Sequence, residues 1–203
     1  MHELFRPQLK LEESFYHGRD VVKIAKDLLG KALFTRFNNR IIGGIIVETE
    51  AYSYKERGCH AYQGKKTMRN EVMFRHGGHA YVYLCYGIHN LFNVVTNEED
   101  QADAVLIRAL EPVKGIEWMK KYSKTDSEKR ITSGPGKLTK ALGIDRSHNA
   151  SLLWSKHLWL EDLGTKVPKS DIISSPRIGI DYAGEDALLP WRFTIKGNAW
   201  ISK

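Results

Sequence analysis

The stretch Ile45-Ile46-Val47-Glu48-Thr49-Glu50-Ala51-Tyr52 decides the fold of this chain, because its run of β-branched apolar residues predicts a buried strand. Two carboxylates and a tyrosine end the strand, and the charged and polar residues 53–58 follow. A carboxylate at a strand end, beside an aromatic face, is a candidate general base over a stacked ring. An ordinary strand that leaves the core through polar residues shows the same pattern, so the segment alone leaves both interpretations open.

The size and composition of the chain favour one compact domain over residues 1–203, since 42% of the residues are hydrophobic and suffice for a core. No apolar run approaches the ~20 residues that span a bilayer. Residues 1–7 carry Glu3 and no continuous apolar stretch, so we expect no signal peptide and a cytoplasmic location. Cys59 and Cys85 lack the spacing of metal ligands, and we expect two free thiols without a structural zinc.

The charge balance is basic, with 31 Lys and Arg against 24 Asp and Glu, a net charge of +7 and a pI near 9.3. A basic surface favours a polyanionic partner, and nucleic acid is the first such partner to consider. Many basic proteins bind no nucleic acid, so the charge alone does not decide the function.

The distribution of apolar residues predicts more strands than helices. We expect a helix over residues 21–30 with Asp20 as its N-cap, and a strand pair over residues 32–37 and 41–50. Gly43-Gly44 inside the second strand predicts a bulge or a close backbone approach. Further strands are expected at 79–86, 91–96, 104–110, 159–160, 177–181 and 191–196, and helices at 112–122 and from 134 to 143. Hairpin connections between these strands predict an antiparallel-rich α+β domain.

The candidate hairpin over residues 80–90 has an unusual tip. Strand alternation places Tyr81 and Tyr83 on one face, and Tyr86 lies at the turn beside Gly87. A tyrosine at this place either folds back onto the sheet or projects as a wedge that enters a base stack. The pattern leaves both alternatives open.

Several motifs occur together and in one order from residue 14 to the C-terminus. They are Ile46-Val47-Glu48-Thr49-Glu50-Ala51-Tyr52, Thr67-Met68-Arg69-Asn70, Tyr81-Val82-Tyr83, Tyr86-Gly87, Leu106-Ile107-Arg108-Ala109-Leu110-Glu111-Pro112, Gly134-Pro135-Gly136-Lys137-Leu138, Arg177-Ile178-Gly179-Ile180, Ala183-Gly184-Glu185 and Arg192-Phe193. With these motifs the chain resembles the alkyladenine DNA glycosylases, also called mammalian-type 3-methyladenine DNA glycosylases, in a bacterial form.

The resemblance implies a single α+β domain with a curved antiparallel-rich sheet, flanking helices and a protruding β-hairpin. It also implies hydrolysis of the N-glycosidic bond of alkylated or deaminated purines, such as 3-methyladenine, 7-methylguanine, hypoxanthine and ethenoadenine, after the nucleotide has rotated out of duplex DNA. Glu50 matches the general base of the family, and Arg108 matches the arginine that holds this carboxylate and its water. The backbone carbonyl of Ile178 matches a third group around the water.

The remaining matches describe the base pocket and the DNA interface. Tyr52, His60 and Tyr83 match the aromatic walls of the pocket, and Asn93 matches the residue that excludes normal guanine. Tyr86 matches the side chain that replaces the extruded nucleotide, with Ile88 and His89 beside it in the minor groove, and we expect phosphate contacts from Thr67, Arg69 and Lys137.

The chain departs from the mammalian pattern at Cys59-His60-Ala61-Tyr62 and at Ile88-His89-Asn90, so the preferred lesion stays open. We expect a monofunctional base-excision-repair enzyme without cofactor or metal, which acts as a monomer on damaged double-stranded DNA of the bacterial nucleoid. Two alternatives share the basic surface and the aromatic residues. They are a lesion-binding protein without catalysis and a binder of single-stranded nucleic acid, RNA included.

Overall fold

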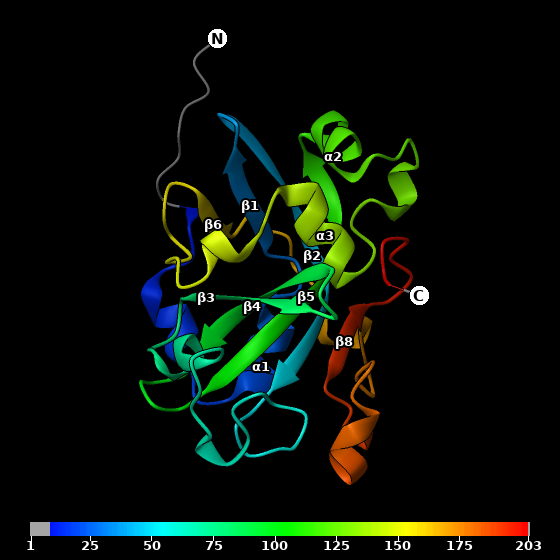
Figure 1. Ribbon diagram of the computed structural model, residues 1–203. Coiled ribbons are helices and arrows are strands. Elements are labelled where there is room, and N and C mark those ends of the chain that lie inside the picture. Colours follow the sequence, from blue (N-terminus) through cyan, green and yellow to red (C-terminus); the bar gives the residue numbers. More distant parts are fainter. Residues whose placement is uncertain (1–8, 203) are drawn as a thin grey trace.

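The computed structural model of the protein describes residues 9–202, which form one eight-stranded sheet with three α-helices (Figure 1). All strand pairs of this sheet are antiparallel. The helices are α1 (Val21–Asp27), α2 (Ile116–Ser123) and α3 (Pro135–Leu142). The strands are β1 (Ala32–Phe37), β2 (Arg40–Tyr52), β3 (Ala80–Cys85), β4 (His89–Thr96), β5 (Asp103–Lys114), β6 (Leu158–Glu161), β7 (Ile172–Ser175) and β8 (Arg192–Ile195). The predicted α+β fold with an antiparallel-rich sheet is confirmed.

Strand β2 is the centre of the sheet, whose order is β3-β4-β5-β2-β1-β6. Residues 40–45 of β2 pair with β1, and residues 48–50 pair with β8. Strand β5 pairs with β2 over residues 43–52. The end of β2 that carries the two glutamates is therefore enclosed between β5 and β8, which explains why these carboxylates lie in the interior.

Bulges in the β2–β5 ladder set the direction of the charged side chains. The pairing passes from Ile46↔Leu110 to Glu48↔Ala109 and then to Thr49↔Ile107, so Val47 and Arg108 have no Cα partner in the ladder. A bulge bends its strand and re-aims the side chains next to it. Arg108 is thereby placed at the bulge that lies opposite the two glutamates.

The Gly43-Gly44 pair also behaves as predicted. The ladder changes register between these residues. A Cβ atom on Gly43 would lie 2.2 Å from a ring carbon of Phe34, and a Cβ on Gly44 would lie 2.5 Å from the carbonyl oxygen of Glu111. The absence of side chains here allows the neighbouring strands to approach the long strand β2 closely.

The helices cover the sheet and leave the β3–β4 hairpin free at its tip. Helix α1 packs against β2 and β5, and α3 packs against β4 and β5. Helices α2 and α3 lie side by side at one end of the sheet, and the segment between β7 and β8, orange in Figure 1, lies at the other end. Tyr86 at the hairpin turn is 87% exposed and has a φ of 49°. The side chain of Tyr86 therefore projects and does not fold back onto the sheet, and its entry into a base stack stays a prediction.

Two predictions of secondary structure are wrong. Residues 177–181 form no strand, because the N–H of Ile178 bonds to the Glu50 side chain and Gly179 has a φ of 77°. The strand of this region, β7, lies earlier, at Ile172–Ser175. Strand β5 continues to Lys114, so the helix expected from residue 112 begins only at Ile116.

The close approach at Gly43 predicts a stability effect. Gly43→Ala places a methyl group against the Phe34 ring and the Leu33 carbonyl oxygen, 2.4 Å away, and we expect the free energy of unfolding to fall by about 1–3 kcal/mol. Urea denaturation measures this change. The control is Gly18→Ala, whose Cβ meets only the flexible end of Ile24 at 3.1 Å. Equal effects of both variants would contradict the prediction.

Candidate active site

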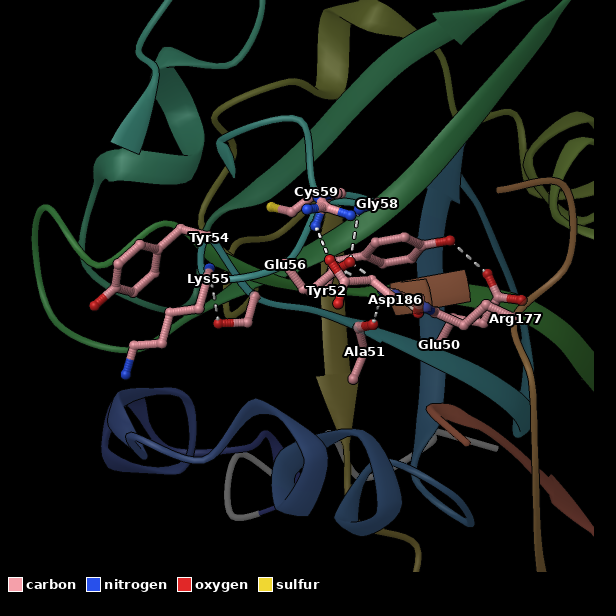
Figure 2. A network of polar contacts seen from close by, with 12 residues as sticks. Glu50, Ala51, Tyr52, Tyr54, Lys55, Glu56, Gly58, Cys59, Arg177 and Asp186 are labelled. Carbon is pink, nitrogen blue, oxygen red and sulfur yellow. Dashed lines mark hydrogen bonds and ion pairs between the residues drawn. The ribbon is translucent and has the colours of Figure 1, made fainter. Parts of the chain in front are cut away.

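The carboxylate of Glu50 is fully buried near the end of β2 and is held by three donors. Its Oε1 atom lies 3.2 Å from Nη1 of Arg108 and accepts a hydrogen bond from the backbone N–H of Ile178 at 2.8 Å. Its Oε2 atom accepts a hydrogen bond from the hydroxyl of Tyr52 at 2.7 Å (Figure 2). The structure therefore brings the three predicted catalytic residues together, and it shows that Ile178 contacts the carboxylate through its N–H.

A second buried carboxylate, Glu48, lies on the same face of β2. Nε of Arg108 donates to Glu48 at 2.8 Å and Nε of Arg192 at 2.7 Å. The N–H and the hydroxyl of Ser202 donate to it at 2.6 and 2.8 Å. Burial alone would raise the pKa of Glu48, but these donors and the two guanidinium charges lower it below its ordinary value. Glu48 is thus an ionised anchor that fixes Arg108 in front of Glu50.

A cavity of about 720 Å³ lies beside this cluster. Tyr52, His60, Tyr83 and Asn93, the four residues expected to form a base pocket, all line it. Glu50 is not among its lining residues, but all three of its hydrogen-bonding and charged partners are. The carboxylate therefore lies directly behind the wall of an aromatic cavity.

The histidine of the cavity wall is held in its neutral form. Nδ1 of His60 lies 2.9 Å from the Tyr81 hydroxyl, and its ring is edge-on to Tyr83 with centroids 4.7 Å apart. Burial lowers the pKa of His60 to about 4, and the positive charge of Arg69 adds to this shift. Asn93 is also fixed, because its Nδ2 donates to the Tyr81 carbonyl at 3.1 Å. The wall is thus rigid and, at this histidine, uncharged at neutral pH.

The residues expected to contact DNA are spread around the cavity. Those that line it are Arg69, Tyr86, His89 and Lys137, and Ile88 is 73% exposed next to the hairpin turn. Thr67 does not line the cavity, and its N–H and hydroxyl both donate to Oδ1 of Asn70. The guanidinium carbon of Arg69 lies 5.1 Å from the centre of the Tyr83 ring. The phosphate contacts of Thr67, Arg69 and Lys137 stay predictions.

Comparison with known proteins identifies the family of this arrangement. The family model of methylpurine-DNA glycosylase (MPG) matches residues 14–199. This chain belongs to the methylpurine-DNA glycosylase family. A protein of Carboxydothermus hydrogenoformans is 49% identical to it, over 93% of this chain and 96% of its own length. A protein of Natranaerobius thermophilus is 44% identical, over 96% of this chain and 99% of its own length. A protein of Chlamydia felis is 44% identical, over 91% of this chain and 95% of its own length. Each of them carries the curated name of an inferred 3-methyladenine DNA glycosylase.

The methylpurine-DNA glycosylase family consists of DNA repair enzymes, and membership makes this chain a monofunctional DNA glycosylase of base excision repair. The predicted family, enzyme class and DNA partner are thereby confirmed. No helix within residues 9–202 is long and apolar enough to cross a membrane. The roles of individual residues are not decided by this membership.

Sequence reasoning did not assign a role to several residues of this candidate site. The position of Glu48 could have been predicted, because residues two apart on a strand lie on the same face and Glu48 is two residues from Glu50. Tyr81 has the same relation to Tyr83. The ion pair between Glu56 and Arg177 lies against the Tyr52 ring. No local pattern predicts this pairing, because the two residues are 121 positions apart in the chain.

A group of metal-ligating side chains also occurs away from the cavity. Within residues 9–202, ligand atoms of Glu13, His17 and His76 lie within 4.8 Å of one another. Nδ1 of His76, the atom that faces Glu13 at 3.8 Å, already contacts the carbonyl oxygen of Gly77 at 3.0 Å. We therefore assign no metal to this group, and the metal-free mechanism stays a prediction.

The lowered pKa of His60 predicts a pH-dependent stability. Unfolded protein takes up this proton near pH 6.5 and folded protein only near pH 4, so the stabilisation is lost as the pH falls through this range. We expect a loss on the order of 2 kcal/mol between pH 7 and 4.5, measured by urea denaturation, and a smaller loss in His60→Gln. The exposed His157→Gln is the control. An unchanged pH dependence in His60→Gln would refute the assignment.

Proposed function

We propose that this enzyme removes alkylated and deaminated purines from duplex DNA, with 3-methyladenine, 7-methylguanine, hypoxanthine and ethenoadenine as its substrate class. The nucleotide rotates into the aromatic cavity, and Glu50 activates the water that replaces the base. One observation supports this proposal most: a buried carboxylate, held by Arg108, Tyr52 and the N–H of Ile178, directly behind a ring-lined cavity. The names of the relatives add support for a methylated purine.

The proposed reaction breaks the bond between C1′ of the deoxyribose and the purine nitrogen. The purine leaves with the electron pair, and the sugar develops the charge of an oxocarbenium ion. The negative charge of Glu50 stabilises this positive charge while its oxygen accepts a proton from the attacking water. The water oxygen bonds to C1′, and an abasic site remains in the DNA.

The hydrogen bonds of Glu50 support one position for the proposed water. A carboxylate oxygen accepts about two hydrogen bonds. Oε1 is occupied by Arg108 and Ile178, whereas Tyr52 is the single donor to Oε2 among the residues that the structure describes. We assign the water to the second position on Oε2, where Arg108 and the carbonyl group of Ile178 complete its surroundings. Because Glu50 is fully buried, this water reaches the carboxylate from the cavity side.

The cavity walls favour damaged purines by charge. Purines alkylated at N3 or N7 are cationic, and electron-rich ring faces attract cations by about 0.5–2 kcal/mol. Arg177 lies over one face of the Tyr52 ring and Arg69 over one face of the Tyr83 ring, so this attraction comes from the opposite faces. A neutral His60 adds no repulsion to this attraction. A cationic base also leaves as a neutral molecule, so its departure needs no general acid, whereas hypoxanthine and ethenoadenine gain stacking only. Asn93 is assigned the exclusion of normal guanine.

The DNA-binding side of the proposal rests on the exposed hairpin tip and the basic residues near the cavity. Tyr86 fills the space of the rotated nucleotide, with Ile88 and His89 beside it in the minor groove. Lys137, Arg69 and Thr67 contact phosphates. In this proposal the enzyme acts as a monomer, without a metal or cofactor, on the DNA of the bacterial cytoplasm.

The role of Glu50 is tested with a hypoxanthine-containing duplex and a 3-methyladenine-containing DNA. We expect wild-type protein to leave alkali-labile abasic sites, and Glu50→Gln to lose about 10³-fold in single-turnover rate while it still binds, because the amide cannot take the proton. Gel analysis after hot alkali measures excision. Tight binding without any excision by wild-type protein would favour the lesion-binding alternative, and excision by Glu50→Gln would refute the proposed base.

The role of Tyr86 is tested by binding to the same duplexes. Tyr86→Ala exposes the hole left by the rotated nucleotide, and we expect affinity for lesion DNA to fall about tenfold, with a smaller effect on undamaged duplex. Fluorescence anisotropy over a series of salt concentrations measures both affinities, and binding should weaken steeply with salt. Tighter binding to single-stranded RNA than to lesion duplex would support the other alternative.

A further inference from the structure

A buried ion pair lies behind the active site. The guanidinium of Arg177 grips Glu56 with two hydrogen bonds, of 2.6 Å to Oε1 and 2.8 Å to Oε2, and the two side chains are 0% and 4% exposed. The same guanidinium donates to the carbonyl oxygens of Ala51 at 2.9 Å and Asp186 at 3.1 Å. The N–H of Gly58 donates to Glu56 at 2.6 Å. The pair thus joins the end of β2 to two loops.

Arg177 is connected to the surroundings of Glu50 in three ways, and Figure 2 shows those through Ala51 and Tyr52. Ala51 is the backbone neighbour of both Glu50 and Tyr52, and its carbonyl oxygen is fixed by Arg177. The Tyr52 ring lies against the guanidinium, with 4.7 Å between its centre and the guanidinium carbon. Ile178, whose N–H donates to Glu50, directly follows Arg177 in the chain.

We propose that the Arg177–Glu56 ion pair positions Glu50 for catalysis, by fixing the Tyr52 hydroxyl and the Ile178 N–H that hold its carboxylate. This inference rests on the proposed function of Glu50. Arg177 and Glu56 do not line the cavity, so they act through other groups and are positioning residues. A displacement of about 1 Å at a reacting group costs on the order of 100-fold in rate, which makes such positioning worth measuring.

The planar fork of arginine is essential to this role. Burial alone would lower the pKa of Arg177, but the hydrogen bonds and charge of Glu56 raise it above its ordinary value. Lysine carries the same charge on a single nitrogen and cannot hold both carboxylate oxygens and the Ala51 carbonyl in one plane. Arg177→Lys therefore keeps the charge and removes the geometry.

The test measures binding and chemistry separately, on the hypoxanthine-containing duplex. We expect Arg177→Lys and Glu56→Gln to lower the single-turnover excision rate about 10- to 100-fold, while Kd for the same duplex stays within about threefold. Leu160→Ala in β6 is the matched control for lost stability. It should lower Tm without changing the rate at an assay temperature well below every Tm.

A milder variant covers the case in which these two do not fold. A Cβ on Gly58 would lie 2.9 Å from Glu56 Oε2 and 3.2 Å from Arg177 Nη2, so Gly58→Ala shifts the pair without removing either charge. We expect it to lower the rate several-fold, again with little change in Kd. In addition, Arg177→Lys should cost less in a Tyr52→Phe background than in wild type, because part of its effect passes through the Tyr52 hydroxyl.

The outcomes separate this inference from the proposed function. One outcome has wild type excising the base, Glu50→Gln not excising it, and the variants of Arg177 and Glu56 losing no more excision rate than Leu160→Ala. This outcome overturns the inference, and the role of Glu50 stands. Equal losses of Arg177→Lys with and without the Tyr52 hydroxyl and no effect of Gly58→Ala overturn it as well. If wild type excises nothing, or Glu50→Gln excises normally, both are overturned.

Discussion

The site depends on one guanidinium that serves two buried carboxylates. Glu48 and Glu50 have no exposed surface and lie on the same face of β2, and Arg108 contacts Glu48 through Nε and Glu50 through Nη1. Without Arg108, the two neighbouring carboxylates would repel each other, and burying both in their charged form would be unfavourable. Removing one member of a buried charge cluster costs about 3–5 kcal/mol, so the bulge that aims Arg108 at both acids is a requirement of the fold.

The two carboxylates are held by different sets of donors. Within residues 9–202 Glu48 has four donors: Arg108, Arg192 and the Ser202 hydroxyl bond to Oε1, and the Ser202 N–H bonds to Oε2. Glu50 has fewer donors, and within residues 9–202 Oε2 has a single one. Glu50 lies behind the cavity wall, whereas Glu48 is held by two arginines and lies beside the C-terminal segment. In the proposed function, Glu48 holds Arg108 in place and Glu50 takes part in the chemistry.

Local patterns explain which parts of this arrangement could be predicted from the sequence. The apolar run before Glu48, the Gly43-Gly44 pair and the alternating tyrosines at 81 and 83 each act over a few residues, and the strands they predict are present. Residues 177–181 look like a strand by composition, but the N–H of Ile178 bonds to a side chain. The Arg177–Glu56 ion pair and the bulge at Arg108 arise from contacts between distant parts of the chain, which no local pattern encodes.

The hairpin β3–β4 connects DNA insertion with base recognition in the proposed function. Tyr86 at its tip, Tyr83 three residues earlier and Asn93 on the returning strand belong to one two-stranded element, in which Tyr81 pairs with Asn93 and Tyr83 with Leu91. The wedge and two parts of the pocket are therefore fixed to each other by the ladder. Helix α3 packs against β4, and Lys137 on that helix lines the same cavity. A phosphate bound by Lys137 would therefore have a fixed position relative to Tyr86. In the proposed function, the tip that enters DNA and the pocket residues Tyr83 and Asn93 therefore keep a fixed position relative to each other.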